Sequence, residues 1–263
     1  MGADMDKLII HPEVPGMVMP GVDRVAPLRA LHWLRLGWAD LAHSPLSFVY
    51  GGAFALMGYA LAFYSAQNLP LALSLFTGFL LLAPLLAVVF YDISRAMDLH
   101  RHYPIHHHLR RLLRIRSGGI GMYALLLLFS MAVWTLMSAV LAGFFLRDNI
   151  GGLGGFAREA FFSGAYGSFV AAYTLLGLVF AAVVFALSVV TLPMLMDRKV
   201  DFATAATTSL WVVRENALPM LVWALLIAAL VALGFATVFF GLVVIFPWLG
   251  HATWHAYRDL VER

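Results

Sequence analysis

Long apolar stretches dominate this sequence and restrict the folds that are open to it. A helix needs about 20 apolar residues to cross the hydrocarbon core of a bilayer. Four stretches have that length, namely 46–66, 70–92, 118–146 and 168–192. A fifth block, 217–257, is too long for one crossing, and we divide it at 234–237. The sequence therefore predicts an all-α, polytopic transmembrane helical bundle of about six spans.

The composition excludes a water-soluble globular domain. Charged residues make up 12% of the 263 residues, which is about half the usual share. Cysteine is absent, so disulfides, thiolate metal sites and a cysteine nucleophile are excluded. Residues 1–27 contain no long apolar run of the kind that a cleaved signal peptide needs. We expect a flexible cytoplasmic tail over 1–27 and a single transmembrane domain over 28–263.

The distribution of basic residues predicts the orientation. With six spans, one side of the membrane receives both termini and the segments 95–116 and 198–214. That side carries 15 of the 17 Lys and Arg residues, and the other side carries only Arg147 and Arg158. Because basic connecting segments are enriched in the cytoplasm, we expect both termini there.

The spans group into three hairpins, and an amphipathic segment precedes each one on the expected cytoplasmic side. Apolar side chains recur in these segments at the three, four and seven residue spacing of a one-faced helix. Such helices can lie in the headgroup layer, with basic side chains near anionic lipid. The apolar stripes are Leu31, Leu34, Trp38 and Leu41; Ile105, Leu109, Leu112 and Leu113; and Phe202, Ala206, Leu210 and Val213. The basic residues of the second segment are Arg110, Arg111, Arg114 and Arg116.

The second span of each hairpin carries a proline, followed by polar residues at helical spacing. The prolines are Pro84, Pro193 and Pro247. One interpretation is that each proline kinks a helix whose polar end emerges into water. The other is that three repeats bring polar groups to one cytoplasm-facing pocket, as repeats do in transporters. The first is favoured, and the pocket candidates are Asp92, Arg95, Asp197, His251 and His255.

The histidines are the main candidates for metal binding. His251 and His255 are four residues apart, so both rings share one helix face, as a metal or haem ligand pair requires. No third ligand stands at a diagnostic spacing, and we predict no metal and no cofactor. The five histidines between His100 and His108 are interpreted as headgroup contacts. No Ser-His-Asp set and no carboxylate pair lies within a span, so the chain is not expected to be an enzyme.

Five short motifs lie between about Leu31 and the C-terminus. They are LGWADL at 36–41, YG at 50–51, YDISR at 91–95, LPMLMD at 192–197 and GHATWHAYR at 250–258. They resemble the signatures of a bacterial integral membrane family catalogued as domain of unknown function 2189. The resemblance implies a bacterial inner-membrane protein. Some members are labelled cytochrome c oxidase subunits, but a catalytic haem-copper subunit needs more histidine ligands than the two that these spans offer.

The leading functional hypothesis is a non-enzymatic integral inner-membrane protein that packs against another membrane complex or assists its assembly. A respiratory complex related to cytochrome c oxidase is one candidate partner. The other expected contact is the lipid bilayer, and no nucleic acid is expected. The alternative is a small-solute transporter or permease that uses the five pocket candidates.

Overall fold

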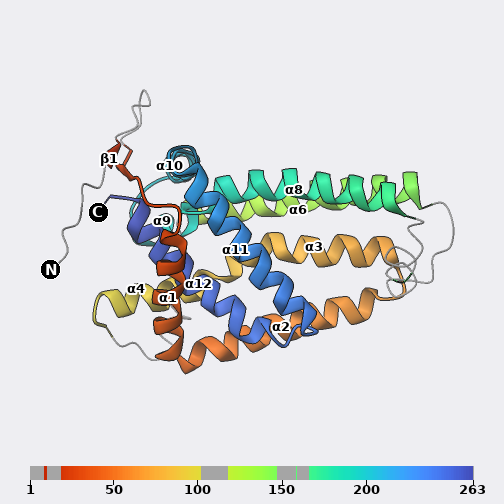
Figure 1. Ribbon diagram of the computed structural model, residues 1–263, viewed down its shortest axis with the longest axis horizontal. Coiled ribbons are helices and arrows are strands. Elements are labelled where there is room, and N and C mark those ends of the chain that lie inside the picture. The colour runs from red at the N-terminus through yellow and green to blue at the C-terminus, as the bar shows by residue number, and fades with distance from the viewer. Residues whose placement is uncertain (1–8, 11–18, 102–117, 147–157, 159–165, 263) are drawn as a thin grey trace.

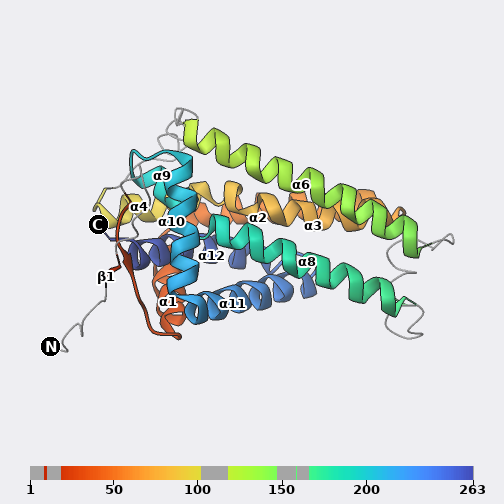
Figure 2. The ribbon, with the colours of Figure 1, turned by 90° about the horizontal axis from the view of Figure 1, so that it is seen from above.

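The computed structural model describes residues 9–10, 19–101, 118–146, 158 and 166–262. Within these ranges the chain forms helices and their connections, together with the short antiparallel strands β1 (Ile9–Ile10) and β2 (Val22–Asp23). The long helices run side by side along one axis, and the C-terminal end of α12 lies at the same end of the bundle as β1 (Figure 1 and Figure 2). The expected all-α helical membrane class is confirmed.

In the described part of the chain, five helical segments are long and apolar enough to cross a membrane. Three of them are single helices, α2 (Pro45–Ser65), α6 (Gly118–Phe145) and α11 (Ala217–Ala236). Another runs from Gly78 in the second half of α3 (Leu69–Leu86) through α4 (Val88–Asp98), and the last consists of α8 (Gly167–Ser188) continued by α9 (Thr191–Asp197). The sixth expected span corresponds to α12 (Leu242–Leu260). It does not qualify, because its second half carries His251, His255, Arg258 and Asp259. The turn before it comprises residues 237–241, slightly later than the expected division.

The three prolines affect their helices differently. Pro84 lies inside α3, and that helix ends within one turn, so that α4 begins after Ala87. Pro193 is the third residue of α9, a position where a missing N–H costs nothing, and the interruption precedes it. Pro247 lies inside α12, which continues through it.

Two amphipathic helices, α1 (Arg29–Ala42) and α10 (Phe202–Glu215), lie across one end of the bundle, roughly perpendicular to its long axis (Figure 1 and Figure 2). We call this the α1–α10 end. On α1, Leu34 and Leu41 are buried while Leu31 and Trp38 are half exposed, and on α10 Leu210 is half exposed. The second expected amphipathic segment, with Arg110, Arg111, Arg114 and Arg116, lies outside the described residues.

α12 is the central helix of the α1–α10 end, and it packs against α1, α2, α4, α9 and α11. Two glycines permit its closest approaches. A Cβ atom on Gly37 would lie 2.5 Å from the backbone nitrogen of Ala252, and one on Gly51 would overlap the backbone oxygen of Val243. The close approach at Gly37 lets α1 bury the face that also carries Trp33, Leu34 and Leu41.

The folded domain begins earlier than the expected boundary at residue 28. Val22 is fully buried and pairs with Val261 in an antiparallel bridge. The Asn216 side chain donates to the backbone oxygen of Asp23 and accepts from the backbone nitrogen of Val25. Residues 19–27 are therefore tied to the C-terminus and to the α10–α11 corner. Most of the expected tail lies outside the described residues.

Candidate functional site around the C-terminal helix

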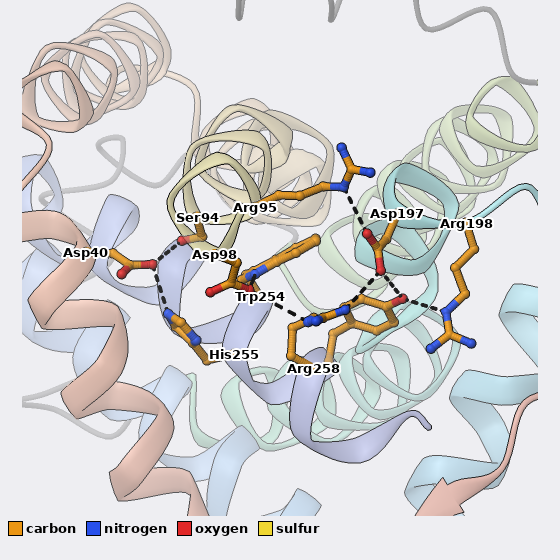
Figure 3. A network of polar contacts seen from close by, with 10 residues as sticks. Asp40, Ser94, Arg95, Asp98, Asp197, Arg198, Trp254, His255 and Arg258 are labelled. Atoms are coloured by element: carbon orange, nitrogen blue, oxygen red, sulfur yellow. Dashed lines mark hydrogen bonds and ion pairs between the residues drawn. The ribbon is translucent and has the colours of Figure 1, made fainter. Parts of the chain in front are cut away.

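Polar side chains from α1, α4, α9 and α12 meet at the α1–α10 end of the bundle (Figure 3). The first set, which we call the histidine network, comprises Asp40, Ser47, Ser94, His251 and His255. Ser94 Oγ donates to Asp40 Oδ2 at 2.5 Å, and His255 Nε2 lies 2.8 Å from the same oxygen. His251 lies between Ser94 (Nδ1 to Oγ, 2.7 Å) and Ser47 (Nε2 to Oγ, 2.9 Å).

The direction of these hydrogen bonds assigns the histidine tautomers. The single hydroxyl proton of Ser94 goes to Asp40, so His251 Nδ1 must donate to Ser94. Ser47 Oγ lies 2.9 Å from His251 Nε2 and also donates to Ser44 Oγ at 2.8 Å. His255 donates from Nε2, because a carboxylate only accepts. The donated protons therefore converge on one half-buried carboxylate. Burial opposes ionisation of Asp40, but the hydrogen bonds from His255 and Ser94 outweigh it and hold the pKa of Asp40 below its usual value.

The histidine network is not a Ser-His-Asp triad, although it contains all three residue types. In a triad the imidazole lies between the hydroxyl and the carboxylate and removes the hydroxyl proton. Here Ser94 lies between His251 and Asp40, and the imidazole donates to it. Ser94 and His251 are also fully buried, so no substrate reaches them in this arrangement.

The second set, which we call the arginine cluster, centres on Asp197 at the end of α9. Asp197 Oδ1 accepts from Arg95 Nε at 2.9 Å. Asp197 Oδ2 accepts from Tyr257 Oη at 2.9 Å and from Arg258 Nη1 at 3.3 Å. Arg198 donates to the same tyrosine oxygen at 3.0 Å. One carboxylate thus connects α4, α9 and α12 through paired charges.

Asp98 extends this cluster on the α4 side. Its Oδ2 accepts from Trp254 Nε1 at 2.8 Å and lies 3.7 Å from Arg258 Nε (Figure 3). Within the arginine cluster, Arg95 and Arg258 pair with Asp197, and Arg258 also lies beside Asp98, so acids and bases are matched. Because partly buried charges cost free energy unless they are paired, this balance is what a structural clamp between helices requires.

The predicted pocket residues do not all reach one cavity. An open groove of about 920 Å³ lies between α4, the start of α6 and the connection from α9 to α10. Arg95 and Asp197 line it, whereas His251 and His255 belong to the histidine network. Asp92 is fully buried on α4. Within the described residues, no group of three His, Asp or Glu side chains is placed to hold a metal ion.

Several residues of the site were not predicted, among them Asp40, Ser94, Tyr257 and Arg258. All four lie within the motifs LGWADL, YDISR and GHATWHAYR, which was the only signal for them. Their partners are between 54 and 215 positions away along the chain, as for Ser94 with Asp40 and His255 with Asp40. Helical periodicity relates only residues of the same helix. The spacing of residues along the sequence therefore could not show which of these side chains pair.

Comparison with known families identifies the central part of the chain. Residues 71–197 match the family described as "Predicted integral membrane protein (DUF2189)". This central part of the chain is similar to the DUF2189 family. This match confirms the family inferred from the motifs. It extends from α3 to α9 and includes the Arg95–Asp197 ion pair, whereas α1 and α12 lie outside the matched range.

The DUF2189 match describes a membrane protein and assigns no activity. No curated protein and no solved structure matches this chain. What the protein does must therefore be argued from its own surfaces and contacts.

Proposed function

We propose that this is a non-enzymatic protein of the bacterial inner membrane that packs against another integral membrane protein and assists its assembly. Both termini would lie in the cytoplasm, as the excess of basic residues at the α1–α10 end suggests. A respiratory complex is the first candidate partner. The observation that carries the proposal is that the outward face of α6 is exposed and lined by small residues.

α6 is the least buried of the five candidate spans, because only 17% of the residues in its most apolar stretch are buried inside the bundle. Small residues follow one another along its exposed side at four-residue intervals, Thr135, Ala139 and Gly143. A Cβ atom added at Gly143 would meet no atom within 4 Å. A shallow groove of about 530 Å³ follows the same helix and is lined by Leu128, Met131, Ala132, Thr135, Leu136 and Ala139.

Small residues at this spacing let the backbone of a second helix approach closely, and packing of that kind drives helix association in lipid. The chemically capable side chains, in contrast, are paired with one another at the α1–α10 end. The proposal therefore assigns the outward face of α6 to a partner helix and the polar clusters to holding the bundle together.

The test is co-purification in mild detergent, comparing the wild-type chain with Ala139→Leu. Leucine would fill the groove and separate the two helices, so partner recovery should fall about tenfold, equivalent to about 1.4 kcal/mol. The matched control is Ala229→Leu, which adds the same side chain to an exposed position of α11. This control should retain the partner.

Three results would contradict the proposal. A wild-type protein that purifies alone, with no other membrane protein at stoichiometric level, excludes a stable partner. Association only with a second copy of the chain excludes an accessory role beside another complex. Equal partner recovery from Ala139→Leu and Ala229→Leu shows that the face of α6 is not the contact.

A small-solute transporter is the second candidate, and the groove lined by Arg95 and Asp197 favours it. It requires the groove to hold a solute. Met122 also lines this groove and is half exposed, so Met122→Trp would obstruct it while leaving the ion pairs in place. If the groove carries solute, a compound that raises the melting temperature of the wild type should not raise that of Met122→Trp. Equal shifts in both proteins would remove this alternative.

A further inference from the structure

The turn between α11 and α12 differs in composition from the turn that joins α2 to α3. The α2–α3 turn carries the exposed polar residues Gln67 and Asn68. The α11–α12 turn, residues 237–241, contains no charged or amide side chain, and no Asp, Glu, Lys or Arg occurs anywhere from 216 to 257. In both views the α11–α12 hairpin ends short of the far ends of α6 and α8 (Figure 1 and Figure 2).

The histidine network fixes how deep this turn lies. His251 of α12 contacts Ser47, the third residue of α2. From Ser47, α2 continues to Ser65, a rise of roughly 27 Å at 1.5 Å per residue. From His251, α12 runs back only to Leu242, roughly 14 Å. The turn therefore reaches little more than half the depth that α2 reaches.

A contact between rings also places the turn well short of the end of α2. Phe239 in the turn packs edge-on against Tyr59 of α2, with ring centroids 6.3 Å apart. Tyr59 precedes the end of α2 at Ser65 by nearly two helical turns, roughly 9 Å. Phe63 and Tyr64, which lie beyond this level on α2, are largely exposed.

The backbone of the turn is arranged as a water-free environment demands. Every backbone N–H from Thr237 to Ile245 donates to an oxygen atom of the hairpin itself. Thr237 contributes its side chain, because Oγ1 accepts from the backbone nitrogen of Gly241 and donates to the carbonyl of Gly234. Non-helical backbone at membrane depth requires internal partners for its polar groups, and the N–H groups of this turn have them.

The exposed side chains of the turn are apolar, as contact with lipid acyl chains requires. Val238 and Phe239 have φ angles of 52° and 70°, in the left-handed region that Gly or Asn normally occupies. Val238 is 59% exposed and Phe240 is 79% exposed. A water-facing turn would be expected to carry small polar residues here, whereas this turn keeps bulky apolar ones in spite of the backbone strain.

We propose that α11 and α12 form a re-entrant hairpin whose tip, Val238 to Phe240, ends inside the hydrocarbon core and contacts lipid acyl chains. Four helical segments then cross the membrane completely, and the hairpin enters from the α1–α10 end and returns to it. Both termini remain on the same side of the membrane. The proposal concerns α11 and α12 alone, so it does not depend on whether a partner covers α6.

Because the chain contains no cysteine, single cysteines can be introduced directly into the full-length protein. The test variant is Phe240→Cys. Gln67→Cys, in the exposed α2–α3 turn, is the control for the far surface, and Lys199→Cys, exposed between α9 and α10, is the control for the α1–α10 end. A membrane-impermeant maleimide is applied to right-side-out and inside-out vesicles. The reactive species is the thiolate, which needs water, so Phe240→Cys should react more than about tenfold more slowly than either control until detergent is added.

A second measurement distinguishes lipid from a protein cover at the tip. The purified Phe240→Cys protein is spin-labelled in detergent and reconstituted into phosphatidylcholine vesicles. Oxygen concentrates in the hydrocarbon core and a water-soluble nickel chelate is excluded from it, so high accessibility to oxygen with low accessibility to the chelate is expected. High accessibility to the chelate, or maleimide labelling as fast as Gln67→Cys from the same side, would overturn the proposal. Low accessibility to both reagents would overturn it as well, because the tip would then be covered by protein.

Discussion

At the scale of single residues, the motif glycines act through close approach of helices. Gly51 and Gly52 are adjacent in α2, but only Gly51 faces α12. Its substitution by alanine should cost about 1–3 kcal/mol, because the new methyl group overlaps the Val243 carbonyl and the helices must separate. Thermal unfolding in detergent measures this change.

Gly52→Ala is the matched control, since a Cβ atom there meets nothing within 4 Å. It should be neutral or stabilising by up to about 1 kcal/mol, because alanine favours the helix. Equal destabilisation by both substitutions would show that the α2–α12 contact is not the cause.

Asp40 makes a pH-dependent contribution at the same scale. Its pKa is lowered in the folded protein, so its stabilisation is complete above the unfolded value, near 4, and is lost as the pH falls through the folded value. Asp40→Asn should therefore lower the stability by about 1–3 kcal/mol at neutral pH and by less in acid. Melting temperatures of both proteins across this range measure the difference. A difference that grows on acidification would contradict the assignment.

At the scale of elements, the arginine cluster is the joint between α4, α9 and α12. Asp197→Ala would leave Arg95 and Arg258 without their shared carboxylate in a site that is only partly open to water. The expected loss of unfolding free energy is about 1–3 kcal/mol, reduced from that of a fully buried pair by solvent screening.

A more exposed ion pair provides the comparison. Arg24 is half exposed and pairs with Glu215 at 2.6 Å, so Arg24→Ala should cost less than about 1 kcal/mol. Chemical denaturation of both variants under the same conditions measures the contrast. If Asp197→Ala were no more costly than Arg24→Ala, the arginine cluster would not be a joint.

At the scale of the whole molecule, the fold places residues 19–27 and the C-terminus together. The backbone nitrogen of Glu262 donates to Gly21, and Val22 pairs with Val261. Both ends of the described domain therefore lie on one side of the membrane. The excess of basic residues predicts that this side is the cytoplasm.

Reporter fusions test this orientation. A fluorescent protein fused after Arg263 should be fluorescent, and alkaline phosphatase fused there should be inactive, because the phosphatase folds only outside the cytoplasm. The same phosphatase fused after Gln67, at the far end of α2, should be active. The reverse pattern would invert the proposed topology.

The sequence alone determined the class of this protein, its long helices and the helical spacing of its polar residues. Those properties follow from local rules, namely the length of apolar runs, their periodicity and the position of proline. The family was also accessible, because its motifs are contiguous stretches such as YDISR and GHATWHAYR.

Only the tertiary structure decided how the polar residues pair and how far the last hairpin reaches. Arg95 meets Asp197, and His251 meets Ser47, across long separations along the chain. Such pairings depend on where the helices cross. The close backbone approaches at Gly37 and Gly51 determine these crossing points. The same crossing points place the turn at residues 237–241 level with Tyr59. An apolar run of sufficient length predicts a span, but the depth that a helix reaches depends on where its neighbours hold it.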